Sequence, residues 1–516
     1  MKLKLFVFLA AIFLTLTACS SEQSGKLDDT DQKKNEINEK ENTADNVTTT
    51  NDNVIDLVAK EVTQPLNSEV TVNAWTFNGT VPGEEIRVQE GEKVTINLTN
   101  ELSEPTSIHW HGIPLENEMD GIPGVTQNAV QPGESFTYEF TATHPGTYMY
   151  HSHQEAVNQM DKGLYGSLIV EPKVKTYDRD YTLMLDEWMS NQEDSDSMNE
   201  NMAGMDHGSM GGMDDGNQEH NEMGEMGHDM SIYDIFTMNG KSGESIEPLK
   251  VKEGETVRIR LANVGYMSHN IHLHGHNFKV AAIDGQELNE PQEISDQLIA
   301  VAPGERYDIE FTADNPGEWY LECHGDMEGT EGMKAVIQYE GSSKSIDQSN
   351  QSENLPIFDF ANYGGAIDDE FSLDQEYDIE YTMDLNGNDM ENIWSINGNS
   401  FPDIDGLNVN EGDLVKVTLV NNSPAGVDHP MHLHGHFFQV LSKNGKPIEG
   451  SPIVKDTLNL KSGDEYVVAF KADNPGNWLF HCHDLHHATA GMVDLIKYEG
   501  FEPNFTLDPN ANNKPE

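Results

Sequence analysis

The chain has 516 residues, enough for two to four domains that each bury a hydrophobic core. It carries 90 acidic and 30 basic side chains, which gives a formal net charge of −60. A polyanion of this strength repels the phosphates of nucleic acids and attracts cations, so nucleic acid is excluded as a partner.

The N-terminus resembles the export signal of a bacterial lipoprotein. Two lysines precede an apolar run that is too short for a stable transmembrane span, and residues 16–19 read Leu-Thr-Ala-Cys. The resemblance implies that residues 1–18 are removed and that Cys19 is acylated, which would anchor an exported protein on the outer face of the cell membrane. An ordinary signal peptide with an incidental cysteine is the alternative. Residues 19–54 are polar and lack aromatic residues, so they predict a disordered tether.

After the tether, one pattern of residues occurs three times. An acidic residue and a glycine are followed by strict alternation of apolar and polar residues in the segments that start at Val88, Val251 and Val409. Each copy continues, some tens of residues later, with two alternating segments joined by a Pro-Gly turn. Helical periodicity is almost absent. The pattern predicts an all-β protein of three consecutive β-sandwich domains.

The repeats also set the expected domain limits. The three domains are expected at residues 55–172, 173–341 and 357–500, with a linker at 342–356 and a C-terminal tail at 501–516.

An insertion interrupts the second repeat at residues 194–230. It holds eight methionines and three histidines but no lysine or arginine, and its methionines stand among Gly, Asp, Asn and Ser rather than among aliphatic residues. Methionines of a hydrophobic core would have aliphatic neighbours at a regular period. We therefore interpret the insertion as a disordered acidic loop with exposed thioethers. Its candidate Cu(I) ligands are Met205, His207, Met210, Met213, Met223, Met226, His228 and Met230.

The last repeat contains a cysteine between two histidines. In a strand, His481 and His483 point to one face and Cys482 points to the other. One metal centre therefore cannot easily bind all three residues, and the segment instead joins two centres. His429 upstream and His487 and Met492 downstream complete a set of two imidazoles, one thiolate and one thioether, as in a blue-copper site. Zinc is the rival metal, but structural zinc sites rarely use methionine.

Four His-x-His pairs occur in the first and third repeats. Each pair points to one face of a strand, and four pairs at equivalent strand positions are not accidental. The pairs are His109 with His111, His151 with His153, His432 with His434, and His481 with His483.

These motifs, read as HWHG, HSH, HxxHxHGH and HCHxxxHxxxxM, resemble those of three-domain multicopper oxidases of the laccase and cuprous-oxidase kind. The resemblance implies three cupredoxin-like Greek-key domains and four copper ions. Type 1 copper would be bound by His429, Cys482, His487 and Met492. Type 2 copper would be bound by His109 and His432. The type 3 pair would be bound by His111, His151, His153, His434, His481 and His483.

The same resemblance implies an activity. A reductant would give single electrons to type 1 copper, and Cys482 with His481 and His483 would carry them to the cluster that reduces O2 to water. Asp120 matches an acidic residue that delivers protons in the family, although an Asp-Gly turn is the alternative interpretation. Ala488 departs from the family pattern, because many relatives have glutamate there.

The second repeat keeps part of the type 1 pattern. His269, Cys323 and Met333 align with the third repeat, whereas Glu328 stands where His487 would be. Two hypotheses remain open, a relic site without copper and an altered mononuclear centre with a carboxylate ligand. The remaining histidines are expected to pack or to form hydrogen bonds. They are His144, His272, His274, His276, His324, His436 and His486.

The reductant is the last open question. Thioethers bind Cu(I), so the insertion favours a cuprous oxidase with a role in copper tolerance. A laccase that oxidises phenols or aromatic amines is the first alternative, and a copper-sequestering lipoprotein without turnover is the second. A nitrite reductase is disfavoured, because that smaller architecture does not use eight such histidines. The protein is expected to be a monomer.

Overall fold

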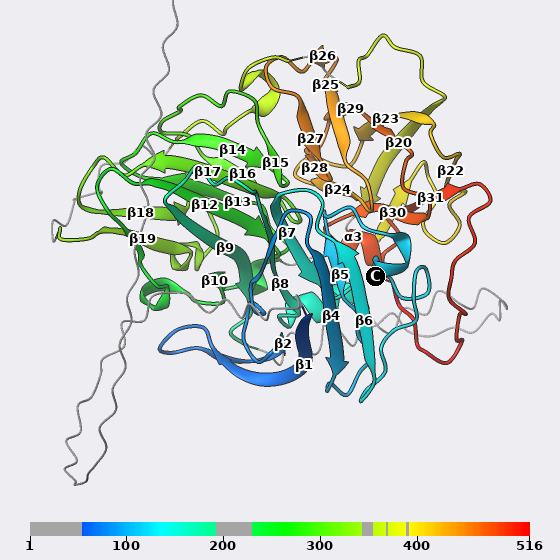
Figure 1. Ribbon diagram of the computed structural model, residues 1–516, viewed down its shortest axis with the longest axis horizontal. Helices are drawn as coiled ribbons and strands as arrows, with labels where there is room; N and C mark the ends of the chain where they lie inside the picture. The colour runs from blue at the N-terminus through cyan, green and yellow to red at the C-terminus, as the bar shows by residue number, and fades with distance from the viewer. Residues whose placement is uncertain (1–53, 192–229, 343–353, 368–369, 389–391, 516) are drawn as a thin grey trace, which may run out of the picture. The chain divides into compact units, whose positions relative to one another are not determined.

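The computed structural model describes residues 54–191, 230–342, 354–367, 370–388 and 392–515. The signal segment, Cys19, the tether and nearly all of the insertion lie outside these residues. Three pairs of β-sheets follow one another along the described chain (Figure 1). The prediction of an all-β protein with three consecutive β-sandwiches is therefore confirmed, while the domain limits given above stay predictions.

The first sandwich contains two four-stranded sheets. One sheet has the order β2-β1-β4-β6 and the other has the order β3-β8-β7-β5. The strands are β1 (Val54–Pro65), β2 (Thr71–Phe77), β3 (Ile86–Gln89), β4 (Lys93–Asn100), β5 (His109–His111), β6 (Ser135–Thr141), β7 (Gly146–His151) and β8 (Tyr165–Glu171).

The second sandwich contains sheets of the order β10-β9-β12-β17-β14-β15 and β11-β19-β18-β13-β16. Its strands are β9 (Arg179–Trp188), β10 (Ile235–Met238), β11 (Leu249–Val251), β12 (Thr256–Asn263), β13 (His269–Leu273), β14 (Lys279–Ile283), β15 (Gln286–Glu287), β16 (Ile299–Val301), β17 (Arg306–Thr312), β18 (Glu318–Cys323) and β19 (Lys334–Tyr339).

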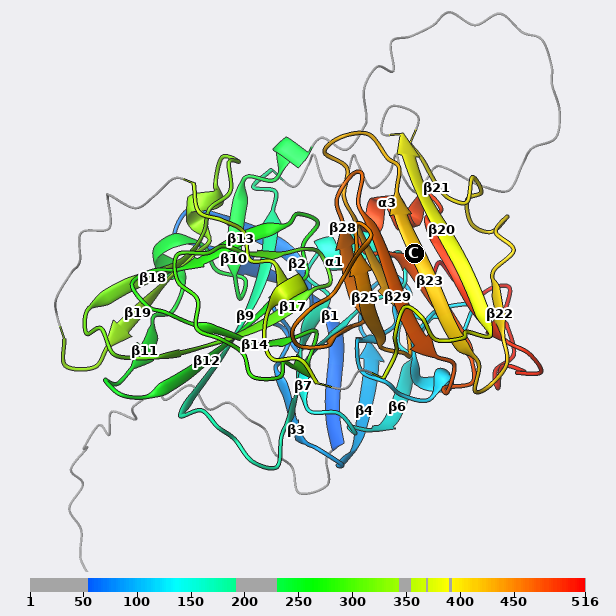
Figure 2. The same cartoon turned by 90° about the horizontal axis from the view of Figure 1, so that it is seen from above.

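The third sandwich repeats this plan, and Figure 2 shows the strands of its larger sheet side by side. The larger sheet has the order β21-β20-β23-β29-β25-β26, with β27 paired to β25, and the smaller has the order β22-β31-β30-β24-β28. The strands are β20 (Ile379–Asn388), β21 (Ile393–Ile396), β22 (Leu407–Val409), β23 (Leu414–Asn421), β24 (His429–Leu433), β25 (Phe438–Lys443), β26 (Lys446–Pro447), β27 (Ile453–Lys455), β28 (Thr457–Leu460), β29 (Glu465–Lys471), β30 (Asn477–Cys482) and β31 (Val493–Tyr498).

The alternation seen in the sequence explains these strands. In β4 and β23 every second side chain is buried and its neighbours face outward, as a half-buried strand requires. The turn before β4 has Gly91 at a φ of 89°, and the turn before β23 has Gly412 at a φ of 97°. Only glycine adopts these left-handed values without strain, which explains the acidic residue–glycine signal.

Helices are short and few among the described residues. They are α1 (Ala156–Asp161) and α3 (Leu485–Thr489), with 3-10 turns η1 (Asn117–Met119), η2 (Met230–Ile232), η3 (Gly243–Ser245), η4 (Thr330–Gly332) and η5 (Phe360–Asn362). No helix in the described part of the chain has the length and apolarity needed to cross a membrane.

Strand pairing brings the histidine motifs together. In the first sandwich β5 pairs with β7, and His109 lies opposite His151. In the third sandwich β24 pairs with β30, and His432 lies opposite His481. Figure 1 shows β5 and β7 beside β24 and β30, so the histidines of the two sandwiches meet at one place.

Candidate metal centres

Cys482 ends β30 with its side chain on the face away from the two flanking histidines, as strand alternation predicts. Its Sγ atom lies 3.7 Å from Nδ1 of His429 and 3.6 Å from Nδ1 of His487. The two imidazole nitrogens are 3.2 Å apart, and all three residues are buried. This group offers one thiolate and two imidazole nitrogens to a single ion.

Met492 is buried next to this group along the chain. Its carbonyl oxygen accepts a hydrogen bond from the backbone N–H of Cys482, and its own N–H donates to the carbonyl of His487. These two backbone bonds hold the Met492 segment against the segment that carries the cysteine.

Three residues that the sequence did not single out contact the two imidazoles. The ring of Trp394 lies 3.6 Å from the ring of His487, centroid to centroid. Ser423 Oγ is 2.8 Å from Nε2 of His429, and Asp484 Oδ2 is 3.5 Å from Nε2 of His487. Such outer contacts fix the orientation of a ligating imidazole. Asp484 and Ser423 lie within six residues of the histidine that each contacts, whereas Trp394 comes from β21, far from His487 in the chain.

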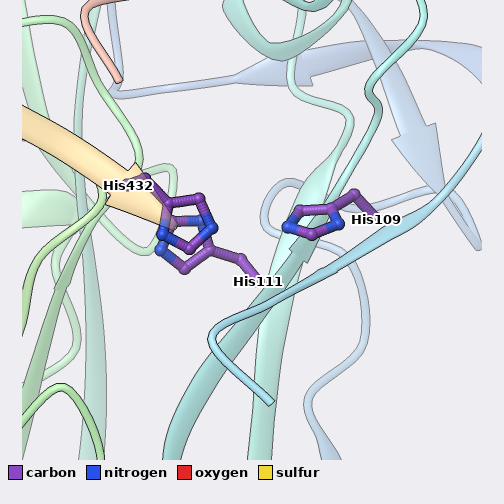
Figure 3. A group of neighbouring side chains, drawn as sticks. All are labelled: His109, His111 and His432. Carbon is purple, nitrogen blue, oxygen red and sulfur yellow. The ribbon is translucent and has the colours of Figure 1, made fainter. Parts of the chain in front are cut away.

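The other histidines form groups whose ligand atoms lie within 4.8 Å of one another. Figure 3 shows one group, in which the rings of His111 and His432 lie face to face, 3.8 Å apart, beside His109. The six residues expected to bind the type 3 pair divide into two triads. These are His111 with His151 and His483, and His153 with His434 and His481. The structure thus brings all eight histidines together, while their assignment to copper types stays a prediction.

The buried nitrogens of this cluster fit a metal. Among the described residues, Nε2 of His109, Nε2 of His432 and both ring nitrogens of His483 are buried without a hydrogen-bond partner. Uncompensated burial of polar atoms is costly, and metal ligation removes the cost. The Nδ1–H of His109 donates to the carbonyl of Asp120, and that of His432 donates to the carbonyl of Asp456, so the Nε2 lone pairs face the cluster.

Burial also keeps the rings neutral. Desolvation, together with neighbouring imidazoles, lowers the pKa values well below the ordinary value in His111, His151, His153, His434, His481 and His483. Only a neutral imidazole binds a metal, so the set is ready for ligation at neutral pH. Nitrogen ligands from histidine suit copper.

Asp120 lies at this cluster and also precedes a turn. Its Oδ2 is 3.0 Å from Nδ1 of His434, and its Oδ1 is 3.2 Å from Nδ1 of His109. The next residue, Gly121, has a φ of 81°, and a Cβ there would collide with the carbonyl of Ile108. The carboxylate thus contacts one histidine from each of the first and third sandwiches, and the backbone after it requires glycine, while a role of Asp120 in proton delivery stays a prediction.

A second buried carboxylate, Asp456, was not expected from the sequence. Its Oδ1 lies 3.4 Å from Nε2 of His111 and 3.4 Å from Nδ1 of His432. Arg306 of the second sandwich donates to both of its oxygens, at 2.6 and 2.5 Å. Burial by itself raises the pKa of Asp456, but Arg306 and the hydrogen bonds hold that pKa well below the ordinary value. The second sandwich thereby fixes an anion beside the cluster.

On the thiol face of the second sandwich, the residues are arranged differently from those in the third. Cys323 Sγ lies 3.9 Å from Nδ1 of His269, and Met333 is buried, but Glu328 is exposed on the surface. The carboxylate next to His269 is instead Glu187, whose Oε2 is 3.0 Å from Nε2. Desolvation lowers the pKa of His269, but Cys323 and Glu187 outweigh it and raise the pKa to about 10. Because Cys323 and Glu187 contact different ring nitrogens of His269, they do not converge on one ion as the ligands around Cys482 do, which supports the relic hypothesis for this face.

Five of the seven other histidines divide into two kinds. His276 and His436 fit the expectation of hydrogen bonding, since each lies within 2.7 Å of a tyrosine hydroxyl. His272, His274 and His324 do not merely pack, because their ring nitrogens form a further group within 4.8 Å. Within the insertion, the candidate copper ligands from Met205 to His228 lie outside the described residues, and only Met230 is described.

Comparison with known proteins agrees with this geometry. A family model described as multicopper oxidase matches residues 58–175, and a second with the same description matches residues 210–342 and 375–499. Multicopper oxidase MmcO of Mycobacterium tuberculosis is 31% identical, over 83% of this chain and 83% of its own. Laccase-1 of Botryotinia fuckeliana is 30% identical, over 81% of this chain and 77% of its own. Copper resistance protein A of Escherichia coli is 25% identical, over 83% and 89%.

Solved structures are similar as well. A multicopper oxidase from Pseudomonas thermotolerans superimposes with a TM-score of 0.63 at 27% identity and covers 86% of this chain and 98% of that one. A laccase from Botrytis aclada superimposes with a TM-score of 0.66 at 25% identity and covers 86% of this chain and 87% of that one. The chain belongs to the multicopper oxidase family and is a copper-dependent oxidoreductase with cupredoxin-like domains.

Proposed function

We propose that this multicopper oxidase oxidises Cu(I) at the expense of O2 and thereby contributes to copper tolerance. The observation that carries this choice of substrate is the methionine-rich composition of the insertion, together with the packing of the residues that flank it. Residues on both sides of it, Met189 and Tyr233, belong to the same apolar cluster as Leu485 of α3 (Leu485–Thr489), the helix that holds His487.

The ends of the insertion are anchored in one apolar cluster. Met189, just before the insertion, and Tyr233, just after it, are buried in this cluster together with Leu485 of α3. Met230 and Met267 pack against the same cluster. Leu485 is two residues from His487, so the residues that flank the insertion share an apolar cluster with the helix that carries a predicted type 1 ligand. Soft thioether ligands select Cu(I) over harder cations.

A carboxylate connects this surface with the imidazole. Asp484 caps the N-terminus of α3, and its side chain is 19% exposed while its Oδ2 contacts His487. The net charge of −60 draws cations toward the protein in general. A cuprous ion delivered by the insertion would therefore meet an anionic group beside a predicted copper ligand.

Copper bound at the predicted ligands would supply one-electron acceptance at the type 1 site and four-electron reduction of O2 at the histidine cluster. The protein itself supplies the route between them. Cys482 is joined by single peptide units to His481 and His483, so a very short covalent path links the two groups of ligands. Asp120 holds His109 and His434 in orientation and offers a carboxylate for proton transfer at the cluster.

The relatives support two substrates. Two relatives are named copper resistance protein A or its homologue, at 25% identity each, which supports the cuprous substrate. Two relatives named laccase are 30% identical, which supports oxidation of phenols or aromatic amines as the second candidate. The insertion decides our preference for Cu(I).

A length-preserving variant separates the two candidates. Every methionine at 194–229 is replaced by serine and every histidine by asparagine, while Met230 is kept because it packs in the apolar cluster. We expect kcat/KM for Cu(I) to fall by about tenfold or more, because the local concentration of substrate is lost, while oxidation of a phenol is unchanged. Equal rates on Cu(I) for both proteins would exclude the proposed role of the insertion.

We further propose that Cys19 is lipidated and that the enzyme acts outside the cell, as the N-terminal sequence suggests. Metabolic labelling with a fatty acid tests this, with Cys19→Ser as the control. Labelling of the wild type alone is expected, and equal labelling of both would contradict the anchor.

A further inference from the structure

The second sandwich repeats the histidine pattern of the third. His269, His272, His274 and His276 have the same spacing as His429, His432, His434 and His436. The strand registers also agree, since His272 lies opposite Glu322 just as His432 lies opposite His481. His272, His274 and His324 thus stand where His432, His434 and His483 join the histidine cluster in the third sandwich, on the face opposite to Cys323, while Glu322 replaces His481.

His272, His274 and His324, here called the second-sandwich triad, form a compact group of nitrogen donors. One ligand atom from each lies within 4.8 Å of the others, and Nε2 of His274 is 3.3 Å from Nε2 of His324. Glu322 adds a carboxylate, with Oε1 2.9 Å from Nε2 of His274 and 3.9 Å from Nε2 of His324. Four donor groups therefore converge on one small volume.

Several ring nitrogens of the triad lack a hydrogen-bond partner among the described residues. Both ring nitrogens of His272 and Nδ1 of His274 are buried without a hydrogen-bond partner among the described residues. Each of these two residues is only 2% exposed. A buried imidazole with no partner on either nitrogen is costly in a folded protein, and a bound cation removes this cost. Burial, followed by the two neighbouring imidazoles, also lowers the pKa of His272 to about 3, so its ring is neutral.

We propose that His272, His274, His324 and Glu322 bind one Cu(II) ion at a mononuclear site that is separate from the centres described above. Three imidazoles and one carboxylate form a nitrogen and oxygen donor set, for which Cu(II) has the highest affinity among divalent first-row metals. Cys323 points to the other face of β18, so no thiolate takes part and the site lacks an intense blue colour.

The donors of the proposed site are accessible to an ion from solvent, and they form one group that holds a single ion. The side chain of His324 is 24% exposed and that of Glu322 is 18% exposed, so solvent reaches the donors. All four donors come from the second sandwich, whereas the cluster of the third sandwich is completed by four histidines of the first. Lys334 Nζ lies 3.0 Å from Oε2 of Glu322, which orients the carboxylate and leaves Oε1 toward the imidazoles.

Copper counting on the full-length protein tests the site. The protein is loaded with Cu(II), freed of weakly bound ions by desalting, and measured by elemental analysis and electron paramagnetic resonance. His324→Ala removes a partly exposed donor, and Cys323→Ser is the matched neighbour whose side chain lies on the other face. Metal held by the insertion or by surface carboxylates contributes equally to the wild type and both variants. A difference in copper content between these proteins therefore reports the ion bound at the triad.

We expect the wild type and Cys323→Ser to hold one more copper than His324→Ala, together with one additional Cu(II) resonance without thiolate character. Equal copper content in wild type and His324→Ala would overturn the site. Loss of the extra ion in Cys323→Ser alone would place it on the thiol face instead. Retention of zinc but not copper at the triad, in a parallel loading with Zn(II), would overturn the choice of metal. None of these readouts depends on turnover or on the identity of the reductant.

Discussion

Asp120 Oδ2 lies 3.0 Å from Nδ1 of His434, although 314 residues separate the two in the chain. The other oxygen of the same carboxylate lies 3.2 Å from Nδ1 of His109. One buried carboxylate thus contacts a predicted type 3 ligand of the third sandwich and a predicted type 2 ligand of the first.

Asp120→Asn tests the role of this carboxylate. The amide preserves size and one hydrogen bond but cannot carry a proton, so we expect O2 uptake to fall by about 10- to 100-fold. Anaerobic bleaching of the type 1 colour by reductant should stay at the wild-type rate, because the thiolate centre is untouched. Slower bleaching together with normal O2 uptake would contradict a role of Asp120 at the cluster.

The pair formed by Arg306 and Asp456 is expected to dominate the stability of the contact between the second and third sandwiches. Both side chains are fully buried. Arg306→Met leaves the buried Asp456 carboxylate without its cationic partner, which should lower the free energy of unfolding by about 3–5 kcal/mol. Denaturant unfolding measures the change. The double variant Arg306→Met, Asp456→Leu should recover part of the loss, and a single variant as stable as the wild type would refute the assignment.

The ion pair of His269 and Glu187 predicts a pH dependence of stability. The pKa of His269 rises from 6.5 to about 10 in the folded protein, so its contribution is complete below 6.5 and is lost as pH rises toward 10. We expect the Tm difference between wild type and His269→Gln to shrink steadily across this range in calorimetry. A difference that stays constant with pH would show that the imidazole is neutral in the folded state.

The grouping of the histidines and of Cys482 with His429 and His487 could largely be predicted from the sequence because the motifs are local. Strand alternation orients His481, Cys482 and His483 without knowledge of the fold, and repetition identifies the strands that carry the pairs. Asp456, Arg306, Glu187 and Trp394 were missed because each reaches its partner through tertiary packing across long separations. No periodicity in the chain encodes such contacts.

Alignment of the repeats was less reliable where the backbone differs. Glu328 follows Cys323 at the spacing at which His487 follows Cys482, but η4 and a turn replace α3 in the second sandwich. The side chain is therefore exposed instead of facing the thiol. From the sequence, the histidines of the second-sandwich triad were expected only to pack or to form hydrogen bonds. A histidine that packs and a histidine that binds metal cannot be distinguished in a sequence, because the difference lies in where the ring nitrogens point.

Simultaneous measurement of colour and O2 uptake on the copper-loaded, full-length protein tests the central claim most directly. With Cu(I) as reductant, we expect an intense blue thiolate band that bleaches and returns as O2 is consumed, with four Cu(I) oxidised for each O2, and neither signal in Cys482→Ser. A colourless wild-type protein, or a blue one that consumes no O2 with either Cu(I) or a phenol, would contradict electron transfer from a Cys482 copper centre to the histidine cluster.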